Sequence, residues 1–446
     1  MKRLILSLTT VILSLATWGQ QAGDKFVIKT TEAVKKTEWS LAGDDAFSDI
    51  SIIKHNGDKL ELFAKGYENM GAWATYDLNQ IESITFTVFH KGDYQEESAA
   101  QAVKNMGLGT CFGNCLDAVD INKTMEKNSV TDFEKCWGQE PTTKPMVDFL
   151  KKNGFNSVRI AVTWFQHMKE DGTVDEAWMN RVQEVVDYVI DNGMYCILNV
   201  HHDTGADPDD KSYTHWIKAD LDNYNANKTK FEYLWTQIAN RFKNYDQHLV
   251  FEGYNEMLDA NNTWNAPKNA NSYKGLNGYA QSFVNAVRAT GGNNETRNLI
   301  VNTYAAACGD EVLNILTIPT DKVSGHIAVE VHTYAPWDWF AKGAWDTSCS
   351  NEIKNMFTRL NNKFICKGIP CIIGEYGTHG SQQVSKKSTT SQIKAAADQA
   401  ADIVKQAKAY GVATFYWMSI FEGTDRTVPQ WTLPTVVEAM QKAYKQ

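Results

Sequence analysis

Eight short apolar runs recur from about residue 101 onward, and they constrain the fold more than any other feature of the chain. Stretches with apolar residues at helical spacing separate them, as Met179, Val182, Val185 and Val186 do before Gly193. Continuously apolar strands that alternate with helices predict a parallel sheet covered on both faces. The runs are 106–112, 157–164, 195–202, 249–256, 299–304, 326–334, 371–377 and 413–419.

Eight such units in residues 101–446 predict a (β/α)8 TIM barrel, an α/β fold in which eight parallel strands close on themselves. The alternative is a doubly wound α/β sheet. That fold often carries a GxGxxG motif after its first strand, and no such motif follows the first run here. The barrel is therefore the predicted fold.

The N-terminal part has a different pattern. Residues 1–20 place Lys2 and Arg3 before an apolar run and then small and polar residues, which predicts a cleaved secretory signal peptide. Residues 21–90 hold short β-type pieces between Gly, Asp and Asn, and predict a small β-rich module with no evident site. The polar residues 91–100 are typical of a linker. We expect a protein that is secreted, periplasmic or at the cell surface.

Charge and cysteine content exclude several classes of function. The formal net charge is −9 without a long basic stretch, so no face for nucleic acid is visible. After the signal, no apolar run reaches the roughly 18 residues that a membrane-spanning helix needs.

Eight cysteines in an exported chain permit disulfides, and their pairing stays open. Cys196 lies in an apolar run and is expected to be a reduced core residue. We expect a soluble monomer.

Polar and aromatic side chains occur in six of the eight runs, at or near the carboxyl ends where TIM barrels assemble their sites. One of the two adjacent histidines is expected to face the barrel interior, and the sequence leaves open which one. The residues are Arg159, Trp164, His201, His202, Asn255, Glu256, His332, Tyr334, Glu375 and Trp417.

Glu256 and Glu375 come from the fourth and seventh runs, on opposite sides of the predicted barrel mouth. Two carboxyl groups that flank an acetal can hydrolyse it when one donates a proton and the other attacks or activates water. Their environments must push their pKa values apart. We expect desolvation to keep Glu256 protonated, and Arg159 and Tyr334 to donate hydrogen bonds to an ionised Glu375. Asn255 could bind the 2-hydroxyl of a sugar.

Several ordered motifs resemble those of glycoside hydrolase family 5 of clan A. The resemblance covers about residues 101–446. The family motifs are VRIAVTW at 158–164, NVHHD at 199–203, FEGYNEM at 251–257, HTY at 332–334, IIGEYG at 372–377 and YWMS at 416–419. The bacterial endoglucanase branch, subfamily 4, is resembled further by MGLGTCFGNCLDA at 106–118, WGQEPTT at 137–143 and HTYAPWDWF at 332–340.

The resemblance implies a retaining double displacement, in which Glu256 is acid and then base and Glu375 is the nucleophile. Retaining enzymes hold these carboxyl groups about 5–5.5 Å apart. One departure lies in the first strand, where the family's Trp-Asn-Leu-Gly-Asn-Thr is replaced by TCFGNC. An expected tryptophan contact is missing there, whereas Asn114 is retained. The implied substrate-binding residues are Arg159, His201, Asn255, His332, Tyr334 and Trp417, to which we add His202 and Asn114.

Other carboxylates and histidines have competing interpretations. Glu252 and Glu330 are expected to be ion-paired core residues rather than catalysts, Glu252 with Arg159. His201, His202, Asp203 and His332 would suit a metal, but barrels of that kind usually open with His-x-His on the first strand, which is absent here. We therefore expect no metal and no cofactor.

The combined prediction is a secreted retaining endo-β-1,4-glucanase whose partner is a β-glucan chain or oligosaccharide. The sequence leaves open whether cellulose-like, mixed-linkage or xyloglucan chains are preferred. The alternatives are a β-mannanase of the same family and a sugar-binding barrel without catalysis. The function of the N-terminal module also stays open.

Overall fold

The computed structural model describes residues 94–120, 129–206, 215–378 and 383–446, together with the course of five strands before residue 94. The expected signal peptide, residues 1–20, lies outside the described residues. The five strands form a two-stranded and a three-stranded antiparallel sheet, in agreement with the β-type pieces predicted between residues 21 and 90. The strands are β1 (Lys25–Lys29), β2 (Ile50–Asn56), β3 (Lys59–Ala64), β4 (Ala74–Asp77) and β5 (Ser83–Thr87).

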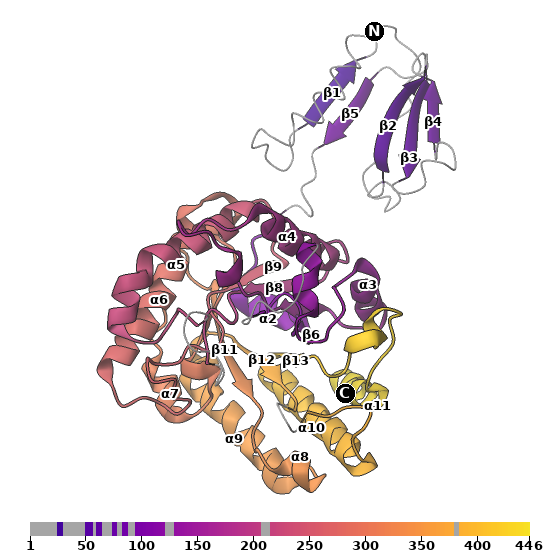
Figure 1. Ribbon diagram of the computed structural model, residues 1–446. Helices are drawn as coiled ribbons and strands as arrows, with labels where there is room; N and C mark the ends of the chain where they lie inside the picture. Colours follow the sequence, from indigo (N-terminus) through magenta and orange to yellow (C-terminus); the bar gives the residue numbers. More distant parts are fainter. Residues whose placement is uncertain are drawn as a thin grey trace. The chain divides into compact units, whose positions relative to one another are not determined.

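Eight parallel strands close into a barrel, and each neighbours the next one along the chain (Figure 1). All eight predicted runs contribute a strand, which confirms the (β/α)8 fold. The strands are β6 (Leu108–Phe112), β7 (Ser157–Ile160), β8 (Tyr195–Asn199), β9 (Leu249–Glu252), β10 (Leu299–Asn302), β11 (Ile327–Thr333), β12 (Cys371–Tyr376) and β13 (Ala413–Tyr416).

Helices connect the strands and cover the outside of the barrel (Figure 1). Helix α10 ends before Gly411, which takes a left-handed backbone at φ 67°. The helices are α2 (Ala99–Met106), α3 (Lys144–Lys152), α4 (Glu176–Ile190), α5 (Leu221–Arg241), α6 (Ala270–Ala289), α7 (Asp310–Ile315), α8 (Trp339–Lys342), α9 (Thr347–Lys363), α10 (Thr390–Tyr410) and α11 (Pro434–Lys445).

Helix α2 differs from the prediction, which assigned Met106 to the first strand and residues 91–100 to a linker. Met106 is the last residue of α2, and β6 begins only at Leu108. The apolar residues of α2 are buried against residues near the starts of several barrel strands, so the helix closes the amino-terminal end of the barrel. Within the expected linker, the Tyr94 hydroxyl hydrogen-bonds the Thr296 hydroxyl at 2.8 Å.

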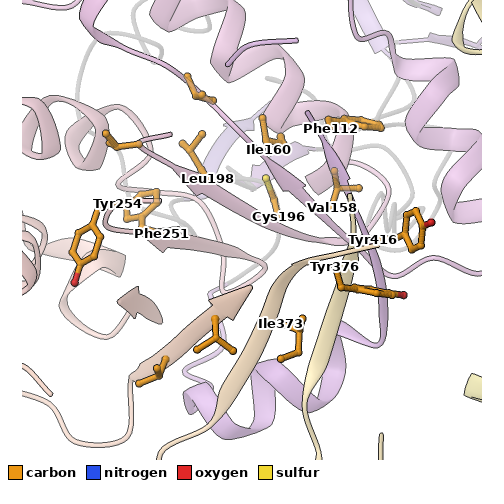
Figure 2. Packing of buried hydrophobic residues seen from close by; sticks show 14 of the residues in the cluster. Phe112, Val158, Ile160, Cys196, Leu198, Phe251, Tyr254, Ile373, Tyr376 and Tyr416 are labelled. Carbon is orange, nitrogen blue, oxygen red and sulfur yellow. The ribbon is translucent and has the colours of Figure 1, made fainter. Parts of the chain in front are cut away.

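Two apolar layers pack on the two faces of the barrel sheet. The outer layer lies between strands and helices and includes Val158 and Leu198 on the neighbouring strands β7 and β8, and Ile373 on β12 (Figure 2). The inner layer fills the barrel interior above α2, at the amino-terminal ends of the strands, with side chains such as Ile197 and Val250. Because successive side chains alternate between faces, the same strands can carry polar groups above the inner layer.

A β-bulge interrupts β12 one residue before Glu375. Val331 pairs with Ile373, but the next residue, His332, pairs with Glu375, so Gly374 is an extra residue in β12. Ile372 belongs to the inner layer, and three regular steps further on Glu375 would point outward. The bulge restores the inward direction, and Arg159, which shares the inner layer's register, hydrogen-bonds Glu375 there.

All eight cysteines lie in the described part of the chain, and none of them forms a disulfide there. Cys196 is fully buried in the outer layer, as predicted (Figure 2). Among the described residues, no helix is both long and apolar enough to cross a membrane.

Candidate active site

The predicted site residues gather at the carboxyl end of the barrel, but several lie beyond the strands that were expected to carry them. Strand β8 ends at Asn199, before His201, and β9 ends at Glu252, before Asn255 and Glu256. The predicted runs were too long at this end, because a run of residue types does not reveal where hydrogen-bonded pairing stops. The side chains therefore sit in the first residues of the βα loops, as usual for this fold.

Arg159 on β7 is the central cation of the site, and none of its side chain is exposed. Its Nε and Nη2 donate to the two oxygens of Glu252 at 2.7 and 2.8 Å, which confirms the predicted ion pair. Nη1 donates to Glu375 Oε1 at 2.9 Å, and Nη2 donates to Asn255 Oδ1 at 2.7 Å. Nε also lies 3.1 Å from Glu330 Oε1. One guanidinium thus fixes three carboxylates and an amide.

Glu375 is the more deeply buried of the two proposed catalytic carboxylates, with 5% of its side chain exposed. Tyr334 donates a hydrogen bond to its Oε2 at 2.6 Å, so both predicted donors, Arg159 and Tyr334, are confirmed. Burial raises the pKa of Glu375, while His332, Arg159 and the Tyr334 hydroxyl act to lower it. The two hydrogen-bond donors and the nearby charge of His332 all favour the ionised form that a nucleophile requires.

Glu256 follows β9 and leaves 21% of its side chain exposed. Glu256 lies four residues past the last strand residue, Glu252, and is more exposed than Glu375; that desolvation keeps Glu256 protonated stays a prediction. Its Oε1 lies 2.8 Å from His332 Nδ1. One carboxylate oxygen of Glu256 and one of Glu375 lie within 4.8 Å of each other. The two carboxyl groups therefore converge on one small space.

His332 on β11 lies between these acids. Its Nδ1 is 2.8 Å from Glu256 Oε1 and 3.6 Å from Glu375 Oε2, and its Nε2 is 3.2 Å from Glu330 Oε1. Burial lowers the pKa of His332, but the surrounding carboxylates outweigh it and raise that pKa to about 10. A pKa near 10 means that both ring nitrogens of His332 carry a proton at neutral pH, so each can donate a hydrogen bond to a carboxylate oxygen.

The structure distinguishes the two adjacent histidines. His201 is buried, its Nε2 lies 3.9 Å from Glu375 Oε1, and its ring stacks parallel to Trp417 at 5.6 Å. Burial lowers the pKa of His201 well below its usual value, so the ring is neutral. His202 points elsewhere, with Nε2 3.3 Å from Asp117 Oδ2. His201 is therefore the histidine that faces the paired carboxylates.

Trp417 and Asn114 come together at the junction of the last and first strands. A Cβ added to Gly113 would lie 2.5 Å from Trp417 Cη2, so the indole rests directly on the Gly113 backbone. Asn114 follows with a left-handed backbone at φ 58° and a partly exposed side chain. Trp417 thus forms one side of the space next to His201, with Asn114 close by.

Asn199 was missed by the sequence analysis. Its Nδ2 lies 3.1 Å from Glu252 Oε1 and 3.0 Å from His201 Nδ1. An amide nitrogen only donates hydrogen bonds, so Asn199 donates to both groups. Nδ1 of the neutral His201 is therefore the acceptor, and its Nε2 carries the proton. The signal was available, because Asn199 is two residues before His201 and points to the same side of the strand.

Two groups of potential ligands have donor atoms within 4.8 Å of one another among the described residues. In the group of Glu256, His332 and Glu375, hydrogen bonds within the protein already occupy the atoms that face each other. The other group consists of Asp117, His201 and His202. The expectation that no metal is used stays a prediction, which a chelator can test.

The sequence profile described as "Cellulase (glycosyl hydrolase family 5)" matches residues 120–423 of this chain. The chain belongs to glycoside hydrolase family 5. It is 34% identical over 364 residues to the cellulase/esterase CelE of Acetivibrio thermocellus, and the match covers 77% of this chain and 40% of CelE. As a member of this family, the protein is a glycoside hydrolase. It spans less than half the length of CelE.

Solved family 5 structures resemble the barrel closely. One is the enzyme PbGH5A of Prevotella bryantii B14, as a mutant in complex with a xyloglucan tetradecasaccharide. It is 57% identical with a TM-score of 0.75, and the match covers 79% of this chain and 100% of PbGH5A. A GH5-4 broad specificity endoglucanase from an uncultured bacterium is 44% identical with a TM-score of 0.72, over 79% of this chain and 98% of that one. The second of these neighbours agrees with the predicted subfamily 4 branch.

Proposed function

We propose that the protein is a secreted, retaining endo-β-1,4-glucanase in which Glu256 is the acid and base and Glu375 is the nucleophile. The observation that carries the proposal is the approach of the two carboxylates to within 4.8 Å between oxygens. Retaining glycosidases hold these groups about 5–5.5 Å apart, whereas inverting ones leave about 6.5–9.5 Å for a water molecule. A separation this short favours direct attack by Glu375 on the sugar.

In the first step, Glu375 attacks the anomeric carbon while Glu256 transfers its proton to the leaving glycosidic oxygen. The bond from the anomeric carbon to that oxygen breaks, and an ester to Glu375 forms. In the second step, Glu256 takes a proton from water, which attacks the anomeric carbon and releases Glu375. Arg159 and Tyr334 hold the Glu375 oxygens throughout, so the carboxylate is oriented before the substrate arrives.

The other polar groups of the site suit a pyranose ring. Asn255 Oδ1 is fixed by Arg159, which leaves its Nδ2 as a donor for a sugar hydroxyl such as the 2-hydroxyl. The partly exposed Trp417 offers an indole face to the apolar face of a pyranose. His201 and Asn114 border the same space, and His202 lies next to it beside Asp117. We assign all of these residues to substrate binding.

We propose β-glucans, including xyloglucan, as substrates because PbGH5A is described with a bound xyloglucan oligosaccharide and the GH5-4 relative as broad in specificity. Export is proposed on the basic and apolar pattern of residues 1–20. Purified protein assayed on carboxymethyl-cellulose, lichenan, xyloglucan and glucomannan should release reducing ends from the first three. Activity confined to glucomannan would instead favour a mannanase.

Glu256→Gln tests the proposal most simply. This variant should lose most turnover of unactivated glucan and still bind oligosaccharide, because the amide keeps the shape of the side chain and cannot donate a carboxylic proton. Glu352→Gln, on the outer face of α9, is the matched control and should retain activity. A wild-type protein that binds glucan without any turnover would support a sugar-binding barrel. Loss of wild-type activity in a chelator would indicate a metal hydrolase.

A further inference from the structure

Glu330 on β11 is a buried charge that the proposed reaction does not use. None of its side chain is exposed, and it was expected to be only an ion-paired core residue. One oxygen, Oε1, makes both of its polar contacts, at 3.1 Å to Arg159 Nε and 3.2 Å to His332 Nε2. The other oxygen, Oε2, has no hydrogen-bond partner among the described residues.

Stability does not account for a carboxylate held in this way. A buried oxygen without a partner costs about 1–3 kcal/mol, and replacing buried ion pairs by neutral groups is often neutral or stabilising. Arg159 already has a bidentate partner in Glu252, at 2.7 and 2.8 Å. A further anion beside the same guanidinium adds repulsion between Glu252 and Glu330. Glu330 therefore calls for a reason other than the stability of the barrel.

The two partners of Glu330 are the groups that hold the two reacting carboxylates. Arg159 reaches Glu375 through Nη1 at 2.9 Å. His332 reaches Glu256 through Nδ1 at 2.8 Å. Both side chains are anchored to Glu330 through their other nitrogens, Nε of the arginine and Nε2 of the histidine. A single oxygen of Glu330 thus lies behind both donors.

The backbone beside the nucleophile leaves room for this carboxylate. A Cβ added to Gly374 would lie 1.8 Å from Glu330 Oε1 and 2.2 Å from its Cδ. Gly374 is also the extra residue of the bulge that turns Glu375 inward. Its φ lies outside the left-handed region, so the local backbone would accept alanine. What requires glycine at this position is therefore the space taken by the Glu330 carboxylate.

We propose that Glu330 is a positioning residue, whose carboxylate orients the His332 ring and the Arg159 guanidinium so that they meet Glu256 and Glu375. The proposal rests on the roles assigned to those two carboxylates. Glu330 touches no reacting atom, and it acts through its two partners. It also supplies one of the negative charges that keep His332 doubly protonated.

The charged surroundings of His332 give this role a signature in the pH profile. Glu375, Glu256 and Glu330 raise the pKa of His332 to about 10, against the effect of burial. If Glu330 becomes neutral, His332 loses its proton at a lower pH. The charged interaction of His332 with Glu256 and Glu375 is then lost at that lower pH as well. The groups that face His332 are Glu256 after β9, Glu330 on β11 and Glu375 on β12, with Arg159 and the neutral His201 close by.

Glu330→Gln tests the role directly on xyloglucan or carboxymethyl-cellulose. We expect kcat to fall about 10-fold or more with KM within about twofold, since orientation rather than substrate contact is lost. The alkaline limb of the kcat/KM profile should move to lower pH, and Tm should not fall. Glu134→Gln is the matched control, because Glu134 is a buried carboxylate paired with Arg181 instead. It should lower Tm and leave the pH profile unchanged.

Gly374→Ala provides a second, independent test, because the added methyl group displaces the Glu330 carboxylate. Gly374→Ala alone should lower kcat about as much as Glu330→Ala does. The double variant Gly374→Ala/Glu330→Ala should have a kcat no lower than either single variant. Gly309→Ala is the control, since a Cβ there meets no described atom within 4 Å. Wild-type kcat and pH profile in Glu330→Gln, or multiplicative losses in the double variant, would overturn the inference. An inactive wild-type protein would overturn the proposed function instead.

Discussion

The Tyr334 hydroxyl donates a 2.6 Å hydrogen bond to Glu375 Oε2, on the side of the carboxylate opposite to Arg159. Burial and the neighbouring carboxylates Glu375 and Glu256 hold the pKa of Tyr334 well above its usual value, so the phenol keeps its proton. Each oxygen of Glu375 thus has its own donor. This pairing favours the ionised carboxylate and fixes its orientation.

Tyr334→Phe should therefore change the acidic side of the pH profile. Removing a donor from the ionised form raises the pKa of Glu375 further, so the acidic limb of kcat/KM moves to higher pH. The loss in kcat should be roughly 10²-fold, as for other donors that stabilise charge in an active site. Tyr188→Phe is the control, because Tyr188 donates to Glu184 within α4. An unmoved acidic limb would contradict this role for Tyr334.

Arg159→Leu should destabilise the fold as well as abolish activity. It leaves the buried Glu252, Glu330 and Glu375 without their shared cation, and uncompensated buried charge costs about 3–5 kcal/mol. The carboxylates then bind protons more tightly in the folded state than in the unfolded one. The deficit should therefore shrink as pH falls from 7 to 5, which urea unfolding at both values measures. A deficit independent of pH would contradict the account.

The matched control for this experiment is Arg241→Leu. Arg241 pairs with the largely exposed Glu176, and exposed pairs contribute about 0–1 kcal/mol. Its removal should cost little stability at either pH.

Much of the fold could be predicted from the sequence, because the barrel strands are buried on both faces and appear as continuous apolar runs. The site was harder. Regular alternation from Ile372 would point Glu375 outward, and only the bulge at Gly374 reverses this. A lone glycine inside a strand is the available signal for such a bulge, although it does not give the direction.

Burial at the ends of strands could not be predicted in the same way. Glu256 and Glu252 share a motif, yet β9 ends at Glu252, so one carboxylate faces the mouth and the other is enclosed. The choice between His201 and His202 likewise depends on partners distant in sequence, namely Trp417 and Asp117. Such long-range contacts leave no periodic trace in one sequence.

The cysteines offer a test that does not depend on activity. None of the eight forms a disulfide in the structure, although we expect the chain to be exported. Burial raises the pKa of the Cys115 thiol to about 11, so this thiol stays protonated and unreactive at neutral pH. A reducing agent should leave Tm unchanged, as measured by calorimetry with and without reductant. A fall in Tm would reveal a disulfide that this structure lacks.

The stereochemistry of hydrolysis tests the central claim most directly. Proton NMR of the first products from a cello-oligosaccharide, recorded before mutarotation, reports the anomeric configuration. Two carboxylates within 4.8 Å between oxygens predict β-configured products, formed through an ester to Glu375. Initial release of α-configured products would contradict the account, because it requires a water molecule between the sugar and the base.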